Sequence, residues 1–357
     1  MNETMLQSQE MRKRGISAIG WRYALAGVII FGIQIFLPRL LRVLFPELIY
    51  NIASDPDYLM GFTFGLVIFA VDIVGFPFVY LITKKLKKQK SEGQKLGIGQ
   101  FILGLFYIAG IMFIGTIVGT ALNSLATLPF GSNTDTNGLA ELMLSSSLIP
   151  RALTVGVLAP IFEELIFRKV LVDCMLPYGK KVAILASGIM FGLFHGNLSQ
   201  CFFAAGIGCF FAFIYVKTGK IWHSILYHMA INLTTSVISV SVVGNMYEAM
   251  NKMGISVDAD TSEIMSIMGD GALAEGMIDA TIAILLAGIW VIFLIGFGIA
   301  GVVLLIVHRK KFTVVEEQEN ITKKQAAKIL LTNPGMWLFY AVCIALFVYE
   351  YISALPK

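Results

Sequence analysis

The sequence predicts an all-α membrane protein, a polytopic helical bundle with about eight or nine transmembrane helices. The chain has 357 residues, of which 57% are hydrophobic and 14% are charged. Soluble domains are typically about 45–50% apolar and about 25% charged, so the composition alone indicates a membrane protein. The second observation is the arrangement of these residues. Apolar runs of about 20 residues, the length that crosses a bilayer as a helix, alternate with short charged segments.

Nine apolar runs are candidates for membrane helices. They span residues 21–45, 59–83, 98–125, 142–167, 182–197, 199–216, 221–243, 278–307 and 336–353. The two runs between 182 and 216 are short for a full crossing. The pattern divides the chain into three parts: 1–140, an N-terminal cytoplasmic segment with accessory helices; 141–243, a core that contains the polar residues described below; and 244–357, an outside loop with C-terminal helices.

The charged segments between these runs alternate in sign. Basic clusters are "MRKR" (11–14), "KKLKKQK" (84–90), Arg168 and Lys169 with Lys180 and Lys181, "KTGK" (217–220) and "HRKK" (308–311). The remaining segments, 46–58, 132–141 and 244–277, carry acidic residues. Because Lys and Arg concentrate in cytoplasmic loops, the alternation predicts nine helices and a cytoplasmic N-terminus. We also expect a short surface helix within 244–277 and an interfacial helix within 309–333.

The sequence does not indicate a cleaved signal peptide, a disulfide framework or a nucleic-acid-binding protein. Residues 1–20 lack the apolar core and cleavage site of a signal peptide, so the first apolar helix is expected to be an uncleaved anchor. None of the four cysteines forms a CxxC pair, which predicts buried reduced thiols and neither a disulfide framework nor a thiolate metal site. A net charge of +4 gives no reason to expect a nucleic-acid partner.

Ionisable side chains interrupt three of the predicted membrane helices. Each costs about 2.5–3.5 kcal/mol on insertion scales, so their presence indicates a functional site. The three groups are Glu163, Glu164 and Arg168 in "APIFEELIFRKV" (159–170), His195 in "FGLFHGN", and His228 with Asn232 in "WHSILYHMAIN".

Helical geometry predicts how the first group lies. Glu164 and Arg168 are i and i+4, with the acid on the N-terminal side, which favours an ion pair. Glu163 then points about a quarter turn away and stays unpaired. Pro160 cannot donate a hydrogen bond to the carbonyl of Gly156, so the helix should bend or open there. Such a break is tolerated in a membrane where it borders protein or a water-filled cavity.

His228 and Asn232 are likewise one helical turn apart, so both can reach a single point. If Glu163 and His195 meet them there, two chemistries are open. A carboxylate with two imidazoles suits a divalent ion such as zinc, which activates water. Without metal, Glu163 would be a general base aided by His195, while His228 and Asn232 donate hydrogen bonds to an oxyanion. Either arrangement hydrolyses an acyl bond, most naturally a peptide bond.

Three other polar residues have simpler interpretations. His223 lies about 140° around the helix from His228, so it is expected to make a packing contact between helices. Asp72 in "FAVDIVG" is expected to make a polar contact or to face a wet cavity. His308 in "HRKK" is expected to be a solvated interfacial charge.

The three polar groups resemble the motifs of the CPBP family, which comprises CAAX proteases and bacteriocin-processing enzymes and is also called Abi. The family pattern is EExxxR, FxxxH and HxxxN, and "EELIFR", "FGLFH" and "HMAIN" match it in order. The resemblance covers about 145–240, so it makes 141–243 a CPBP-like catalytic core. One departure is Lys169, where the family often has Gly after the Arg.

The resemblance implies an all-α intramembrane endopeptidase, commonly regarded as a metalloprotease, whose site opens toward the cytoplasm. By position in the motifs, the implied catalytic residues are Glu163, His195, His228 and Asn232, which would also hold a metal, zinc first among the candidates. Glu164 and Arg168 would be supporting residues. The implied partners are the lipid bilayer and a membrane-associated peptide or protein substrate, and the expected location is the bacterial plasma membrane.

Two other functions remain as alternatives. A non-catalytic bacteriocin-immunity or scaffold protein of the same fold has no need for a carboxylate, two His and an Asn together. A transporter using the intramembrane acids as a proton relay predicts internal repeats, which the sequence does not show. The prediction is therefore a protease of the CAAX type.

Overall fold

The computed structural model describes residues 3–91, 93–128, 143–144, 146–252, 274–315 and 322–353, and these residues form helices and no strands. The α-helices are α1 (Glu3–Leu44), α2 (Pro46–Ala53), α3 (Pro56–Val67), α4 (Phe76–Thr83), α5 (Ile98–Thr127), α7 (Leu148–Arg151), α8 (Ala159–Glu164), α9 (Asp173–Met175), α10 (Lys180–Phe194), α11 (Leu198–Thr218), α12 (Ile221–Asn232), α13 (Val240–Lys252), α15 (Ala274–Val307), α16 (Lys323–Leu331) and α17 (Pro334–Ser353). The π-helical segments are η1 (Ile68–Gly75), η3 (Ala152–Leu158), η4 (Leu165–Val172) and η6 (Leu233–Ser239), and short 3-10 turns are η5 (Leu176–Tyr178) and η7 (Arg309–Lys311).

All nine predicted helices occur, which confirms the all-α membrane fold. Seven helical stretches among the described residues are long and apolar enough to span a membrane: Gln9–Leu44, Pro56–Thr83, Ile98–Thr127, Leu198–Thr218, Ile221–Lys252, Ile278–Val307 and Pro334–Ser353. The predicted runs 142–167 and 182–197 are helical but are not among these seven stretches. The stretch from α7 to η5 contains several charged residues, and α10 has only 15 residues.

The helix predicted over 142–167 is longer than expected. It begins at Leu148 and continues without interruption through η5. The predicted end at 167 is wrong because the charges that follow are paired inside the bundle and do not mark an exit to water. Lys169 Nζ lies 3.0 Å from Asp173 Oδ2, and the Tyr215 hydroxyl donates to Asp173 at 2.8 Å. Asp173 is buried, so this network belongs to the packed structure.

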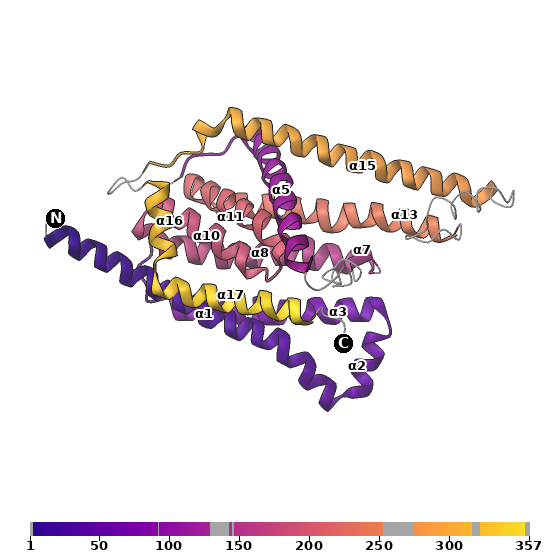
Figure 1. Cartoon of the computed structure of the whole chain (residues 1–357), viewed down its shortest axis with the longest axis horizontal. Coiled ribbons are helices and arrows are strands. Elements are labelled where there is room, and N and C mark those ends of the chain that lie inside the picture. The colour runs from indigo at the N-terminus through magenta and orange to yellow at the C-terminus, as the bar shows by residue number, and fades with distance from the viewer. Residues whose placement is uncertain are drawn as a thin grey trace.

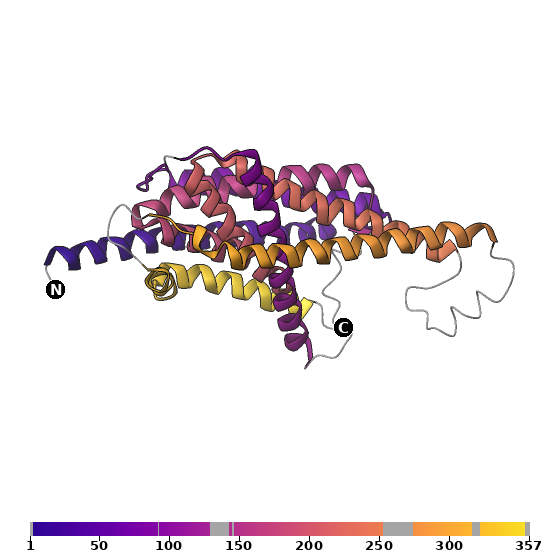
Figure 2. The ribbon, with the colours of Figure 1, turned by 90° about the horizontal axis from the view of Figure 1, so that it is seen from above.

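The long helices pack in pairs around α10 and α11. In Figure 1, α17 lies along α1, and α15 lies along the outside of the bundle near α13. Figure 2 shows α5 crossing this bundle obliquely, against α11 and α15. Close approach of α1 and α17 requires glycine, because a Cβ at Gly335 would lie 2.1 Å from the carbonyl oxygen of Ser17. The core therefore forms where several helices cover α10 and α11.

The basic segments gather at one end of the bundle. Asn333 Nδ2 donates to the carbonyl of Lys13 at 2.9 Å, which holds α17 beside the N-terminal basic cluster. The backbone N–H of Gln94, four residues after the basic segment 84–90, donates to the carbonyl of Lys217 in "KTGK" at 2.9 Å and holds these two parts of the chain together. In Figure 1 the N-terminus, α16 and the end of α15 lie on this same side. This arrangement is what the predicted alternation of charge requires.

A helix is present within 309–333 as α16, and its position at the membrane interface stays a prediction. The Thr322 side chain accepts from the backbone N–H of Gln325, and Gln325 caps Thr322 in return. Ala326 and Leu330 on one face are fully buried, while the lysines face outward. Within 244–277, where a short surface helix was expected, α13 covers the first residues, and 253–273 lie outside the described residues. The acidic segment 132–141 lies outside them as well.

Two further expectations concern cysteine and histidine. All four cysteines are free, with Cys174 and Cys343 buried and Cys201 and Cys209 partly buried. His308 is less exposed than the expected solvated position implies. Its Nδ1 lies 2.8 Å from the Tyr107 hydroxyl, and the residue is half-buried.

Candidate active site

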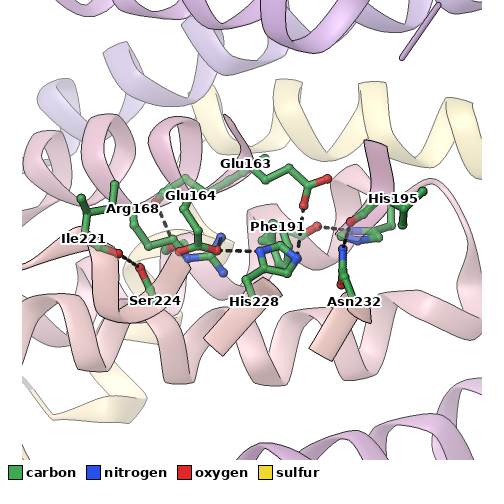
Figure 3. Close-up of polar contacts among 12 residues, drawn as sticks. Glu163, Glu164, Arg168, Phe191, His195, Ile221, Ser224, His228 and Asn232 are labelled. Atoms are coloured by element: carbon green, nitrogen blue, oxygen red, sulfur yellow. Dashed lines mark hydrogen bonds and ion pairs between the residues drawn. The ribbon is translucent and has the colours of Figure 1, made fainter. Parts of the chain in front are cut away.

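The two adjacent glutamates end the short helix α8, between the π-helical segments η3 and η4. π-Helical turns change which side chains share a face and are frequent at functional sites. The Glu164 side chain is fully buried, whereas 27% of the Glu163 side chain is exposed. The two carboxylates therefore have different environments although they are neighbours in sequence, and Figure 3 shows them directed to different sides of His228.

Glu164 forms the predicted ion pair with Arg168. Arg168 Nη1 lies 3.1 Å from Glu164 Oε1, and both side chains are fully buried. No nitrogen of Arg168 makes an aligned hydrogen bond to any described residue. Instead its guanidinium carbon lies 4.2 Å from the ring centroid of Phe191 and 5.2 Å from that of Phe211. Attraction to Glu164 and to the faces of two aromatic rings compensates the buried positive charge.

His228 lies between the two glutamates. Its Nδ1 is 3.0 Å from Glu164 Oε1, and its Nε2 is 3.7 Å from Glu163 Oε2. The carboxylate of Glu164 accepts, so in the neutral ring the proton is assigned to Nδ1 and the lone pair of Nε2 faces Glu163. A carboxylate on the far nitrogen fixes the tautomer and the orientation of a functional imidazole. Sequence reasoning missed this contact, because it treated Glu164 only as the partner of Arg168.

His195 is also oriented by a hydrogen bond at Nδ1, but here the acceptor is a backbone carbonyl and not a carboxylate. It caps the C-terminus of α10, and its Nδ1 lies 2.8 Å from the carbonyl oxygen of Phe191. A carbonyl oxygen only accepts, so Nδ1 carries the proton and Nε2 is left as an acceptor. The Phe191 ring packs edge-on against His195 at 4.8 Å and against His228 at 5.7 Å between centroids. Phe191 thus fixes both imidazoles and also faces Arg168.

Asn232 satisfies a backbone carbonyl that Pro160 leaves without a hydrogen-bond donor. In η3 the N–H of Ala159 donates to the carbonyl of Thr154, five residues back. The next bond of this register would run from residue 160 to the carbonyl of Val155, but proline has no N–H. Asn232 Nδ2 donates to that carbonyl at 2.8 Å. The opening predicted at Pro160 is therefore present, and one amide hydrogen of Asn232 is committed to it.

We expect Asn232→Ala to lower the free energy of unfolding by roughly 1–2 kcal/mol, because the Val155 carbonyl loses its donor inside the protein. Adding Pro160→Ala restores a backbone N–H, so the double variant should recover at least about 0.5 kcal/mol relative to additivity. The measurement is unfolding in mild detergent. Pro77→Ala follows another π-helical segment, η1, and provides the control, since its effect should simply add to that of Asn232→Ala. Additive effects for Pro160→Ala as well would contradict this account.

The residues fit a divalent metal in donor type but not in placement. Both imidazoles leave Nε2 free, and Glu163 offers a partly exposed carboxylate, which are donors that zinc accepts. Among the described residues, however, no group of three or more His, Cys, Asp or Glu side chains is placed to hold an ion. The direct contacts bring His228 to the two glutamates, while His195 is joined to them through Phe191.

Two residues with simpler predicted roles lie near these helices. His223 is buried, and its Nδ1 lies 3.2 Å from the Thr218 hydroxyl, so it makes the expected packing contact outside the site. Asp72 is only 6% exposed and lies on η1, which packs against α8. In the described part of the chain its carboxylate has no hydrogen-bond partner, so the polar contact is not found there, and the wet cavity, the other expectation for Asp72, stays a prediction.

Comparisons with known proteins match the part of the chain that contains these residues. Residues 145–234 match the family model described as "Type II CAAX prenyl endopeptidase Rce1-like", a range that includes every site residue from Glu163 to Asn232. The chain is also 30% identical over 175 residues to "Putative membrane peptidase YdiL" of Bacillus subtilis (strain 168), which is 48% of this chain and 70% of that protein. No solved structure matches the chain. The match over most of that relative, together with the motif-bearing core, places the chain in the Rce1-like type II CAAX prenyl endopeptidase (CPBP) family.

Proposed function

We propose that this chain is an intramembrane endopeptidase that hydrolyses a peptide bond of a membrane-associated peptide or protein, with Glu163 as the general base. The observation that carries the proposal is the position of His228. Glu164 holds one side of the ring, and the other side faces Glu163, the more exposed of the two carboxylates. A purely structural pair of buried charges needs only Glu164 and Arg168, so Glu163 has no structural reason to lie there.

In the proposed mechanism a water molecule bound between Glu163 and the Nε2 atom of His195 attacks the peptide carbonyl carbon. Glu163 takes the proton from water, and the carbonyl oxygen becomes an oxyanion. The second amide hydrogen of Asn232 is available to donate to that oxyanion, because only one is used by Val155. The C–N bond then breaks, and the proton on Glu163 passes to the leaving nitrogen.

His228 assists the return of the proton. Its neutral ring accepts at Nε2, so it can take the proton from Glu163 and deliver it to the leaving nitrogen. The buried carboxylate of Glu164 stabilises the imidazolium that forms, as the orienting acid does in a serine protease triad. This assignment differs from the sequence-based expectation, in which His228 donated directly to the oxyanion, because the contact with Glu164 assigns the proton of the neutral ring to Nδ1.

The site belongs to the end of the bundle where the basic segments gather. Arg168 and Lys169 follow Glu163 within two helical turns, and the loop that contains Gln89 bonds to the backbone of Asp173 there. Under the positive-inside rule this end faces the cytoplasm. We therefore propose a bacterial plasma-membrane protease that receives its substrate from the cytoplasmic side, with a leader peptide, a signalling peptide or the tail of a membrane protein as substrate.

Comparison of the membrane and secreted peptides of wild-type and Glu163→Gln strains tests this function. We expect uncleaved precursors to accumulate in the variant and the matching fragments to be lost, because only the base has been removed. The precursor termini then identify the cleavage site. Identical peptide sets at equal protein levels would contradict the proposal and would favour a non-catalytic immunity or scaffold protein.

Zinc stays a prediction, supported by the donor types and by what the family resemblance implies. If an ion binds, Glu163, His195, His228 and Asn232 would hold it, and it would lower the pKa of a bound water. Elemental analysis of protein purified without chelator tests it: about one zinc per chain would support the prediction, and no zinc would agree with the placement of these side chains in the structure. His228→Ala should remove that zinc while His223→Ala retains it. Wild-type protein free of bound metal but fully active would reject the prediction.

A further inference from the structure

A cavity of about 190 Å³ lies between the start of α5, the end of α11 and the residues that follow α15. It is separate from the candidate active site, since none of Glu163, Glu164, His195, His228 and Asn232 lines it. The two regions use different faces of α11. Phe210 and Phe213 line the cavity, whereas Phe211 packs against His228.

The rim of the cavity is basic. Lys95, Lys217 and Lys311 line it, and its lining residues include no Asp or Glu. All three lysines are exposed, and within the described ranges none of their ammonium groups pairs with a carboxylate. Lys217 Nζ lies 5.4 Å from the ring centroid of Phe213, which positions it over the apolar floor. Three unpaired positive charges around one cavity favour an anionic ligand.

The floor of the cavity is aromatic. The Phe312 ring lies 4.9 Å from Tyr107, 6.3 Å from Phe210 and 5.7 Å from Phe213, measured between centroids. The hydroxyl of Tyr107 is bonded to His308, so this polar group is not left unpaired against the apolar floor. A ligand that fits both rim and floor has an anionic head and an apolar body.

The helix ends at the cavity do not oppose an anion. α5 begins at Ile98, so its partially positive N-terminal end lies beside the rim. The C-terminal end of α11 would contribute the opposite partial charge, but its carbonyls are occupied. Val216 accepts from the Ser91 hydroxyl, and Lys217 accepts from the N–H of Gln94. The field at the cavity is therefore set mainly by the lysines.

The cavity lies level with the ends of three membrane spans. Its lining residues come from the first turns of the span that begins at Ile98, the last turns of the span that ends at Thr218, and the segment just beyond Val307. This depth corresponds to the lipid head groups at the basic end of the bundle. We propose that the cavity binds an anionic phospholipid, with its phosphate among Lys95, Lys217 and Lys311 and its apolar part against the aromatic floor.

Native mass spectrometry of the full chain released from nanodiscs of phosphatidylglycerol or of phosphatidylcholine tests the proposal. We expect the wild-type chain to retain one phosphatidylglycerol molecule and no phosphatidylcholine. The triple variant Lys95→Gln, Lys217→Gln, Lys311→Gln should bind phosphatidylglycerol roughly 100-fold more weakly, because each basic residue near an anionic lipid strengthens binding several-fold. Leu103→Trp, which fills the cavity without changing charge, should also abolish retention.

The control triple variant Lys84→Gln, Lys87→Gln, Lys324→Gln removes the same charge from exposed positions outside the cavity and should retain the lipid. Thermal unfolding supplies a second measurement, since phosphatidylglycerol should raise the Tm of the wild type more than that of the cavity triple variant. Equal loss of lipid in both triple variants would overturn the proposal. Displacement of the retained lipid by inorganic phosphate alone would overturn it too, because that result assigns a phosphate site without a lipid body.

Discussion

Glu163→Gln is expected to lower kcat/KM for peptide hydrolysis by at least about 100-fold, the usual contribution of a positioned general base. The substitution keeps the shape of the side chain and removes only its ability to take a proton from water. Stability should change little, because the Glu163 side chain is partly exposed and makes no close hydrogen bond, its nearest ring nitrogen being 3.7 Å away on His228. The measurement is cleavage of the peptide identified from the accumulated precursors, in detergent or in vesicles.

The matched control for this prediction is Glu248→Gln. Glu248 is an exposed glutamate on α13 whose ion pair with Lys252 lies at the surface, so its loss should leave hydrolysis unchanged. Equal Tm values for wild type and both variants would show that the loss of activity is chemical. Turnover by Glu163→Gln at the wild-type rate would remove Glu163 from the mechanism and with it the proposed role of His228.

The helices of the bundle could be predicted from the sequence because each depends on the length and apolarity of its own run of residues. Runs such as 98–125 and 278–307 have the length and apolarity of a span, and α5 and α15 contain them with boundaries shifted by at most a few residues. The Glu164–Arg168 pair was accessible for the same reason, since i and i+4 geometry places both side chains on one helical face. The predicted end at 167 placed Lys169 in the charged segment after the helix, because only the packed structure shows that the helix continues to its partner Asp173.

The remaining parts of the site depend on contacts between helices, which the sequence pattern does not contain. Glu164 and His228 are 64 residues apart, and their hydrogen bond follows from the packing of α12 against α8. The bond from Asn232 to Val155 depends on a π-helical register that no periodicity indicated. A missing N–H at Pro160 was the one local signal, and it predicted the break without naming the residue that satisfies it.

Arg168→Met is expected to destabilise the protein by about 3–5 kcal/mol, the usual cost of leaving one member of a buried ion pair without its partner. Glu164 is fully buried, so after this change its charge keeps only the hydrogen bond from His228. Arg168→Lys should be intermediate. It retains the charge but loses the planar guanidinium that lies over Phe191 and Phe211. The measurement is the free energy of unfolding in mild detergent.

The double variant Glu164→Gln, Arg168→Met separates stability from function at this pair. Removing the uncompensated carboxylate should restore most of the stability lost in Arg168→Met, because a buried charge pair is worth little more than neutral groups of similar volume. Hydrolysis should nevertheless stay low, since a neutral group at position 164 cannot stabilise protonated His228. If the double variant unfolds as easily as Arg168→Met, the buried charge is not the cause of the instability. If it unfolds normally and cleaves at the wild-type rate, Glu164 only balances Arg168, and the proton transfer assigned to His228 is wrong.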